Sequence, residues 1–178
     1  MLLTGLPGVG KTTMMNRICK HYETRGLKIA GITTKEVRED NQRVGFRITD
    51  LATGNEGWLA GTDTGAGPRI GRYVVATEDL EKVGVGALER ATQGDAGLIV
   101  VDEIGPMEMT NSAFRGVVSK ILLGERVVVA TLKYGSHYPE VERVLGTSVL
   151  LEITKENRDA LYGKAIEQLN DWIDKQGS

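Results

Sequence analysis

Nine residues near the start of the chain constrain the fold more than any other stretch. A short apolar run, residues 1–4, leads into Gly-Leu-Pro-Gly-Val-Gly-Lys-Thr-Thr, residues 5–13. This is the spacing G-x-x-x-x-G-K-[ST], in which glycines let successive backbone N–H groups point into one concavity that fits phosphate oxygens. A helix must follow, because the positive end of its dipole completes the anion site. The stretch predicts a strand, a phosphate-binding loop and a helix.

The whole loop is expected to contribute to phosphate binding. Lys11 can reach the outer phosphates of a bound nucleotide, and the Thr12 hydroxyl can bind Mg²⁺, which is the implied cofactor. The candidate phosphate-binding residues are Gly5, Leu6, Pro7, Gly8, Val9, Gly10, Lys11, Thr12 and Thr13.

The composition describes one ordinary globular domain over residues 1–178. Hydrophobic residues make up 40% of the chain and charged residues 26%. The net charge of −2 gives no electrostatic footprint for general nucleic-acid binding. The only cysteine, Cys19, excludes an internal disulfide and favours a reducing cytoplasm. No apolar run approaches membrane-spanning length, and we expect a monomer.

Apolar runs alternate with stretches of helical periodicity along most of the chain. This pattern predicts an α/β fold with three layers, in which helices cover both faces of a mainly parallel central sheet. The expected strands are 1–4, 27–33, 97–101, 126–131 and 148–153, and the expected helices are 11–25, 77–91, 111–122, 139–145 and 157–175.

Residues 34–77 do not follow this alternation of strands and helices. Val44, Phe46 and Ile48 alternate with polar or small residues, which is typical of a half-buried strand. Residues 58–60 and 72–75 are two further short strand candidates, and the Gly-rich stretch 61–68 between them is expected to be a loop. We therefore expect a small antiparallel β insertion at about residues 34–77.

Two carboxylates follow a buried strand in the sequence Leu-Ile-Val-Val-Asp-Glu, residues 98–103. Asp102 is the expected partner of the Mg²⁺ at the loop. Glu103, beside it, can act as general base toward the attacking water. An Asp-Glu pair alone can be a solvated strand end, but beside a phosphate-binding loop it predicts catalysis.

Thr131 ends the next expected strand. If that strand lies between the first strand and the one that carries Asp102, the Thr131 hydroxyl can sense the terminal phosphate or hold the water. The alternative is an ordinary strand-end hydroxyl, and the sequence favours neither.

A cation is usually needed to stabilise the transition-state charge. Arg69 and Arg72 are the favoured candidates, because they directly follow the Gly-rich loop and loops that close over a site often carry such residues. The competing residues are Arg38, Arg47 and Lys133.

The residues that would bind the nucleotide base are the hardest to identify from the sequence. Trp58 and Tyr73 can stack on a purine, although core packing is the default for large aromatics. Asn157 lies in the stretch 154–158 that follows the last strand, a position at which related folds hold the base. The alternative for Asn157 is a cap for the last helix.

Several stretches together resemble the THEP1-type nucleoside-triphosphatase family. The stretches are 5–13, 31–38, 43–46, 69–75, 102–108 and 154–158. The more specific signals are Asp-Glu-Ile-Gly-Pro-Met-Glu at 102–108, Glu-Val-Arg at 36–38 and the pattern Arg-x-Gly-x-Tyr at 69–73. The resemblance implies one P-loop domain that hydrolyses ATP, GTP and other nucleoside triphosphates to the diphosphate and phosphate. It also implies Mg²⁺ dependence and loose base selectivity, with Lys11 and Thr12 on phosphate and metal, Asp102 on the metal and Glu103 on the water.

Two other functions share the phosphate-binding loop. A nucleotide or polynucleotide kinase usually has an Arg-rich lid, and the candidate lid at 61–72 holds only two Arg. A non-catalytic nucleotide-binding adaptor would not need Glu103. The sequence therefore favours a hydrolase of nucleoside triphosphates over a kinase and over an adaptor.

Overall fold

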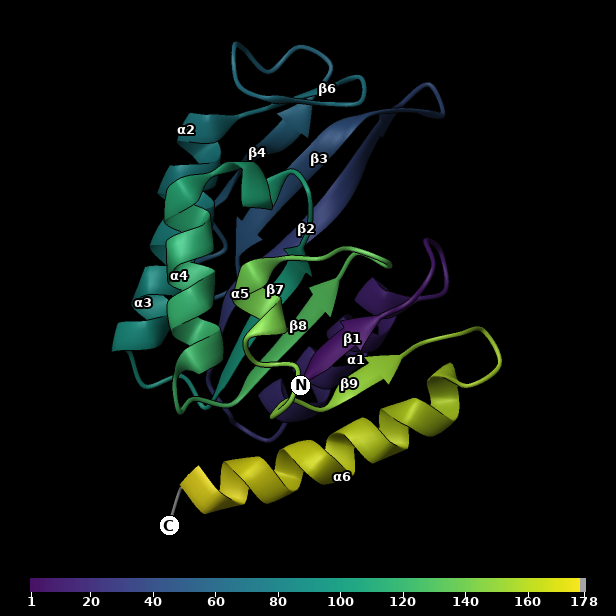
Figure 1. Ribbon diagram of the computed structural model, residues 1–178, viewed down its shortest axis with the longest axis vertical. Coiled ribbons are helices and arrows are strands. Elements are labelled where there is room, and N and C mark those ends of the chain that lie inside the picture. The colour runs from purple at the N-terminus through teal and green to yellow at the C-terminus, as the bar shows by residue number, and fades with distance from the viewer. Residues whose placement is uncertain (177–178) are drawn as a thin grey trace.

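A single nine-stranded sheet organises the computed structural model, which describes residues 1–176. The strand order is β5-β6-β4-β3-β2-β7-β8-β1-β9. Helices cover both faces of this sheet (Figure 1). The predicted three-layer α/β fold is confirmed.

The strands are β1 Leu2–Thr4, β2 Ile29–Glu39, β3 Gln42–Asp50, β4 Glu56–Gly61, β5 Arg69–Ile70, β6 Tyr73–Val75, β7 Leu98–Ile104, β8 Val128–Leu132 and β9 Leu150–Glu152. The helices are α1 Lys11–Glu23, α2 Thr77–Asp79, the π-helix η1 Leu80–Val85, α3 Gly86–Gln93, the 3-10 helix η2 Glu108–Thr110, α4 Ser112–Leu123, α5 Pro139–Glu142 and α6 Arg158–Gln176.

The half of the sheet that carries the phosphate-binding loop is parallel. It comprises β2, β7, β8, β1 and β9, with β8 between β7 and β1. Leu98 and Val100 of β7 pack in the cluster that includes α1 and α6, whereas Ile99 and Val101 pack in the cluster that includes α3 and α4. Burial on both faces explains the continuous apolar run of this strand. The carboxyl ends of β1, β7 and β8 consequently meet at one edge.

The other half of the sheet is antiparallel and is formed by the insertion. β2 continues past its parallel partner and pairs with β3, with Thr34 opposite Ile48. Asp40 and Asn41 form the turn of this hairpin, with φ values of 45° and 61° that suit a two-residue turn. The sequence predicted only 27–33 as this strand, because residues 34–39 are largely polar and are held by backbone pairing rather than by burial. The insertion extends the central sheet and adds the two-residue strand β5, which had no sequence signal.

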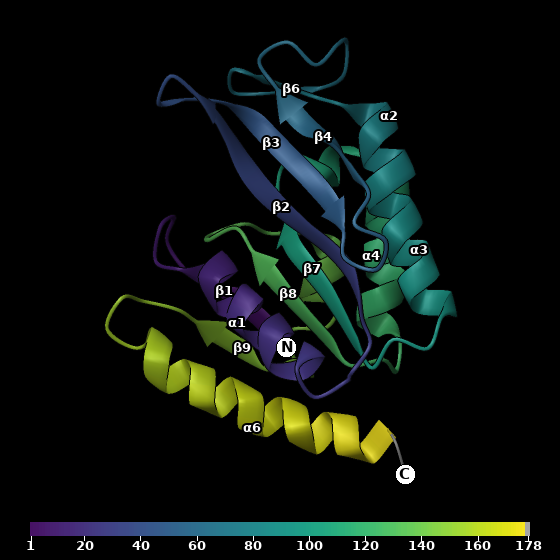
Figure 2. The same ribbon diagram turned by 180° about the vertical axis from the view of Figure 1, so that it is seen from behind.

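α1 lies on the face of the sheet seen in Figure 2. Its buried side chains are those predicted from the periodicity, Met14, Met15, Ile18, Cys19 and Tyr22. On the opposite face, the helix predicted from Thr77 is continuous to Gln93 but contains the π-turn η1. Gly84 lies in that turn, and a Cβ there would meet Ile48 of β3 at 2.8 Å. The small residue lets the helix approach the sheet closely.

α6 runs beside β9 along one side of the molecule (Figures 1 and 2). It buries Ala165 and Leu169 and is otherwise largely polar. Within residues 1–176, no helix combines the length and the apolarity that crossing a bilayer would require.

Candidate active site

The phosphate-binding loop connects β1 to α1. Three of its glycines have positive φ values, 147° at Gly5, 78° at Gly8 and 107° at Gly10. At Gly5 a Cβ would also lie 2.3 Å from the carbonyl oxygen of Ile153, so only glycine fits. α1 begins at Lys11 without a side-chain cap and without an acidic residue in its first turn. Its first N–H groups and its dipole are therefore available to an anion.

Lys11 lies across this loop. Its Nζ donates a hydrogen bond to the carbonyl oxygen of Gly5 at 2.8 Å and a longer one to that of Leu6 at 3.4 Å. These contacts hold the ammonium group against the carbonyl oxygens at the start of the loop. The role of Lys11 toward the outer phosphates of a nucleotide stays a prediction.

Asp102 lies at the carboxyl end of β7 and is 2% exposed. Thr131 on the neighbouring strand β8 is fully buried and donates a hydrogen bond to Oδ1 of Asp102. The strand order therefore satisfies the condition under which Thr131 was expected to contribute to the site. Burial raises the pKa of Asp102, and the hydroxyls of Thr131 and Thr12 and the ammonium of Lys11 oppose that rise.

Glu103 follows Asp102 and is half-buried. Burial and the neighbouring Asp102 carboxylate raise its pKa, whereas Lys11 and Lys133 lower it. Two cations thus face the carboxylate that was predicted to activate water. The pair Lys11 and Glu103 combines a phosphate-binding charge with a candidate base in one place.

Glu108 is a further acid at this site, to which the sequence assigned no role. It begins η2 and is 2% exposed. Burial and the charge of Glu103 raise its pKa to about 8. The sequence feature that could have identified Glu108 is its position at the end of the Asp-Glu-Ile-Gly-Pro-Met-Glu stretch. A turn between Glu103 and Glu108 brings both side chains to the same cavity.

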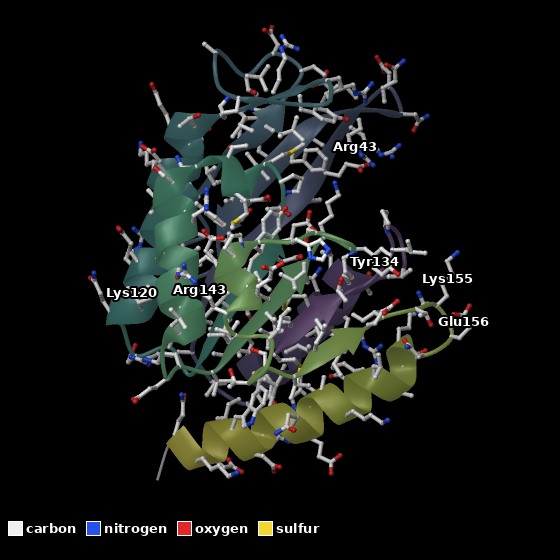
Figure 3. All side chains as sticks on the ribbon, viewed as in Figure 1. Arg43, Lys120, Tyr134, Arg143, Lys155 and Glu156 are labelled. Carbon is white, nitrogen blue, oxygen red and sulfur yellow. The ribbon has the colours of Figure 1, made fainter. Side chains whose placement is uncertain are left out.

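A cavity of about 880 Å³ connects the phosphate-binding loop to the insertion. Figure 3 shows Arg43 on the insertion and Tyr134 on the loop after β8, which both line it. Apolar and aromatic side chains from the insertion form one wall, namely Phe46, Leu59, Ile70 and Tyr73. The other lining residues are Leu6, Pro7, Gly8, Gly10, Lys11, Thr12, Thr13, Thr34, Gly71, Glu103, Pro106, Met107, Glu108 and Lys133.

The insertion contributes Arg43 to this cavity, whereas Arg69 and Arg72 are not among its lining residues. Arg72 donates a hydrogen bond to the carbonyl oxygen of Arg43, and its guanidinium carbon lies 5.1 Å from the ring centroid of Tyr73. Arg43 forms an ion pair with Glu36. The role of Arg69 and Arg72 in the transition state stays a prediction. Of the competing cations, Lys133 lines the cavity, and Arg47 instead stacks on Trp58, at 4.2 Å from its ring centroid.

Asn157 organises the loop between β9 and α6. Its Oδ1 accepts a hydrogen bond from the backbone N–H of Thr154 at 2.8 Å, and its Nδ2 donates to the carbonyl oxygen of Glu152 at 3.0 Å. This is a local structural role, but both bonded groups lie outside α6, so the predicted cap of that helix and the base-binding role of Asn157 both stay predictions. Next to it, Nη1 of Arg158 would lie 3.6 Å from a Cβ at Gly10, so this loop borders the phosphate-binding loop. Lys155 and Glu156 are exposed at its tip (Figure 3).

A second cavity, of about 810 Å³, lies at the far end of the insertion. Its acidic lining residues are Glu39, Asp63, Glu78 and Asp79, and neither Lys nor Arg is among its described lining residues. Such a surface repels phosphate groups. The cavity at the phosphate-binding loop is therefore the candidate active site.

Comparison with known proteins identifies the family of this chain. A family model described as NTPase matches residues 1–166. Proteins named nucleoside-triphosphatase THEP1 are similar to this chain. The one from Thermofilum pendens is 46% identical over 163 residues, which cover 90% of this chain and 89% of that protein. The one from Thermotoga sp. strain RQ2 is 43% identical over 171 residues, 95% of this chain and 94% of that protein.

Two solved structures share the fold. The crystal structure of THEP1 from the hyperthermophile Aquifex aeolicus matches with a TM-score of 0.81 and 32% identity, covering 95% of this chain and 98% of that one. The solution structure of a human cancer-related nucleoside triphosphatase matches with a TM-score of 0.80 and 28% identity, covering 96% and 97%. The family model, the close relatives and the shared fold agree, and the chain belongs to the NTPase family.

Proposed function

We propose that this protein hydrolyses nucleoside triphosphates such as ATP and GTP to the diphosphate and phosphate, with Mg²⁺ as cofactor. The observation that carries the proposal is the placement of Glu103 in the same cavity as Lys11 and the phosphate-binding loop. A module that only binds nucleotide has no need for a carboxylate beside the terminal phosphate. The names of the relatives, nucleoside-triphosphatase, agree with this assignment.

The residues present fit a divalent cation. Oδ2 of Asp102 is buried and has no hydrogen-bond partner, although Oδ1 is bonded to Thr131. A buried carboxylate oxygen without a partner is costly unless a cation satisfies it. Thr12 and Asp102 would hold Mg²⁺, which prefers oxygen ligands and neutralises charge on the phosphates when bound.

The chain's own groups account for the remaining chemistry. The N–H groups of the loop and Lys11 bind and orient the phosphates. Glu103 accepts a proton from a water molecule as the water oxygen forms a bond to the terminal phosphorus and the bond from that phosphorus to the leaving oxygen breaks. The leaving diphosphate keeps the electron pair. Lys133, which lines the same cavity, faces the charge that develops.

Loose base selectivity follows because the proposed contacts are made to the phosphates of the nucleotide and not to its base. Backbone N–H groups and Lys11 recognise phosphate, which all nucleoside triphosphates share. The loop that borders the phosphate-binding loop on its other side, residues 154–158, has an exposed tip and its Asn157 is engaged in local hydrogen bonds. A site of this kind offers little base-specific hydrogen bonding.

The cytoplasm is the proposed compartment. Cys19 is a free cysteine buried in α1. Burial raises the pKa of its thiol to about 12, which leaves it protonated and unreactive. A lone structural thiol of this kind suits a reducing environment. The expected monomer stays a prediction.

One observation favours a phosphotransferase as second candidate. The cavity continues past Glu103 to the apolar wall of Phe46, Ile70 and Tyr73, where an acceptor could sit in place of water. A kinase would use Glu103 as base toward an acceptor hydroxyl.

The experiment that separates these functions is an assay with product separation. Pure protein is incubated with Mg²⁺ and each common nucleoside triphosphate, with and without nucleosides, nucleoside monophosphates and short oligonucleotides. Diphosphate and free phosphate formed without an acceptor support the hydrolase. Diphosphate formed only with an acceptor that becomes labelled supports the kinase, and binding without turnover supports the adaptor.

A further inference from the structure

A buried acid outside the catalytic pair lies in the active-site cavity. Glu108 is 2% exposed and lines the cavity together with Lys11, Glu103 and Lys133. The ion pairs found in residues 1–176 do not include it. A carboxyl group in this position is costly to ionise, because it is buried and none of these ion pairs compensates its charge.

The turn between the two acids brings their side chains together at Gly105. A Cβ on Gly105 would lie 2.7 Å from Oε1 of Glu103 and 2.8 Å from Oε2 of Glu108. Both oxygens therefore border the same point, and at most about 5.5 Å separates them. No side chain fits at Gly105 without displacing the two carboxyl groups, which explains the glycine in this stretch.

Two neighbouring carboxyl groups in a site of low polarity do not both ionise readily. Glu103 is only half-buried and lines the cavity beside the cations Lys11 and Lys133, whereas Glu108 is 2% exposed. Glu108 faces the carboxylates of Glu103 and Asp102 and the phenol of Tyr138, and only the backbone N–H groups of Gly105 and Glu108 itself favour its charged form. The proton of the pair consequently resides on Glu108, whose pKa is raised to about 8.

We infer that Glu108 is a positioning residue for hydrolysis, whose buried carboxylic acid donates a hydrogen bond to the Glu103 carboxylate and fixes the orientation in which Glu103 meets the attacking water. A neutral acid beside a carboxylate makes a short, charge-assisted hydrogen bond. Holding the base in one orientation increases the fraction of bound substrate that is ready to react. The inference rests on the proposed role of Glu103.

The test compares Glu108→Gln, Glu108→Leu and Glu103→Gln with wild type in steady-state hydrolysis of ATP. Gln keeps the shape and a donor, whereas Leu fills the space without one. We expect Glu108→Leu to lower kcat by roughly 10–100-fold with KM within about threefold of wild type. Glu108→Gln should keep kcat within about threefold. Glu167→Leu, an exposed position on α6, is the control.

The pH profile adds a readout that a purely structural role would not change. Wild-type kcat should fall at alkaline pH as Glu108 ionises, because the hydrogen-bond donor of its carboxylic acid is then lost. Glu108→Gln cannot ionise and should not show this fall. If Glu108→Leu does not fold, the pH profiles of kcat for wild type and Glu108→Gln are sufficient to test the inference.

The inference is overturned if Glu108→Leu keeps the wild-type kcat, if kcat of Glu108→Gln falls as low as that of Glu108→Leu, or if the kcat profiles of wild type and Glu108→Gln fall alike at alkaline pH. Failure of the proposed function looks different. In that case Glu103→Gln itself turns over at the wild-type rate, whatever the Glu108 variants do.

Discussion

Thr131 and Asp102 lie on the adjacent strands β8 and β7, and the Thr131 hydroxyl donates a hydrogen bond to Oδ1 of Asp102. Both side chains are buried, so the hydrogen bond is shielded from water. It occupies one carboxylate oxygen and leaves Oδ2 as the oxygen without a partner. The contact thus fixes how Asp102 presents its free oxygen to the site.

Removing this hydroxyl tests the relationship. Thr131→Val keeps the shape of the side chain but leaves Oδ1 of Asp102 without its donor. We expect kcat to fall by roughly 10–100-fold, as for other residues that orient a ligand of a metal. The free energy of unfolding should fall by about 1–3 kcal/mol, because a buried acceptor is unsatisfied. Thr131→Ser, which keeps the hydroxyl, is the control, and equal kcat values in Val and Ser variants would contradict the account.

The cations around the cavity can be ranked by substitution. Lys133 lines the cavity and faces Glu103, whereas Arg72 contacts Arg43 and Tyr73. We expect Lys133→Ala to lower kcat by about tenfold, and Arg72→Ala to have a smaller effect, in assays at saturating nucleotide. Lys155→Ala, at the exposed loop tip, is the control. A larger loss in Arg72→Ala would show that the insertion closes and brings this side chain to the phosphates, as the sequence predicted.

The backbone of β2 at Gly31 has no room for a side chain. Its φ is +124°, and a Cβ would lie 1.9 Å from the carbonyl oxygen of Val100 in β7. Gly31→Ala should lower the free energy of unfolding by about 3 kcal/mol or more. Gly116→Ala in α4, where a Cβ meets nothing within 4 Å, should instead raise it by up to about 1 kcal/mol. Chemical denaturation measures both, and a tolerated Gly31→Ala would contradict the strand pairing described for β2 and β7.

The protonation of Glu108 has a signature that is independent of activity. Its pKa is raised from 4.5 to about 8 in the folded protein, so between these values the folded state binds more protons than the unfolded state. The contribution of this group to the free energy of unfolding is therefore most favourable at low pH and decreases as pH rises to about 8. Glu108→Gln should reduce the slope of that free energy over this interval, by a few kcal/mol in total at most. An unchanged slope would show that Glu108 is ionised throughout.

The catalytic core was predictable because its signals are local. The loop at residues 5–13 has a fixed spacing between an apolar strand and a helix, and Asp102 and Glu103 directly follow a buried strand. Each requirement lies within a few consecutive residues. The apolar face of α1 and the continuous apolar run of β7 were predictable for the same reason, since each pattern is visible in a single segment.

The remainder depends on contacts between distant segments. Thr131 became interpretable only once the strand order placed β8 between β1 and β7. Arg43 and Tyr73 reach the cavity because the antiparallel half of the sheet curves beside it, which no single segment indicates. Glu108 is buried by the turn at Gly105, and a sequence shows a Glu there without showing that the turn encloses it.

The most direct test of the account is the activity of Glu103→Gln. The variant keeps the size of the side chain but has no carboxylate to accept a proton from water. Binding of a fluorescent nucleoside triphosphate and steady-state release of phosphate would be measured in parallel with wild type and Mg²⁺. We expect binding within about threefold of wild type and a kcat lower by roughly 10²–10⁴-fold. Phosphate release near the wild-type rate would remove Glu103 from the mechanism and contradict the account.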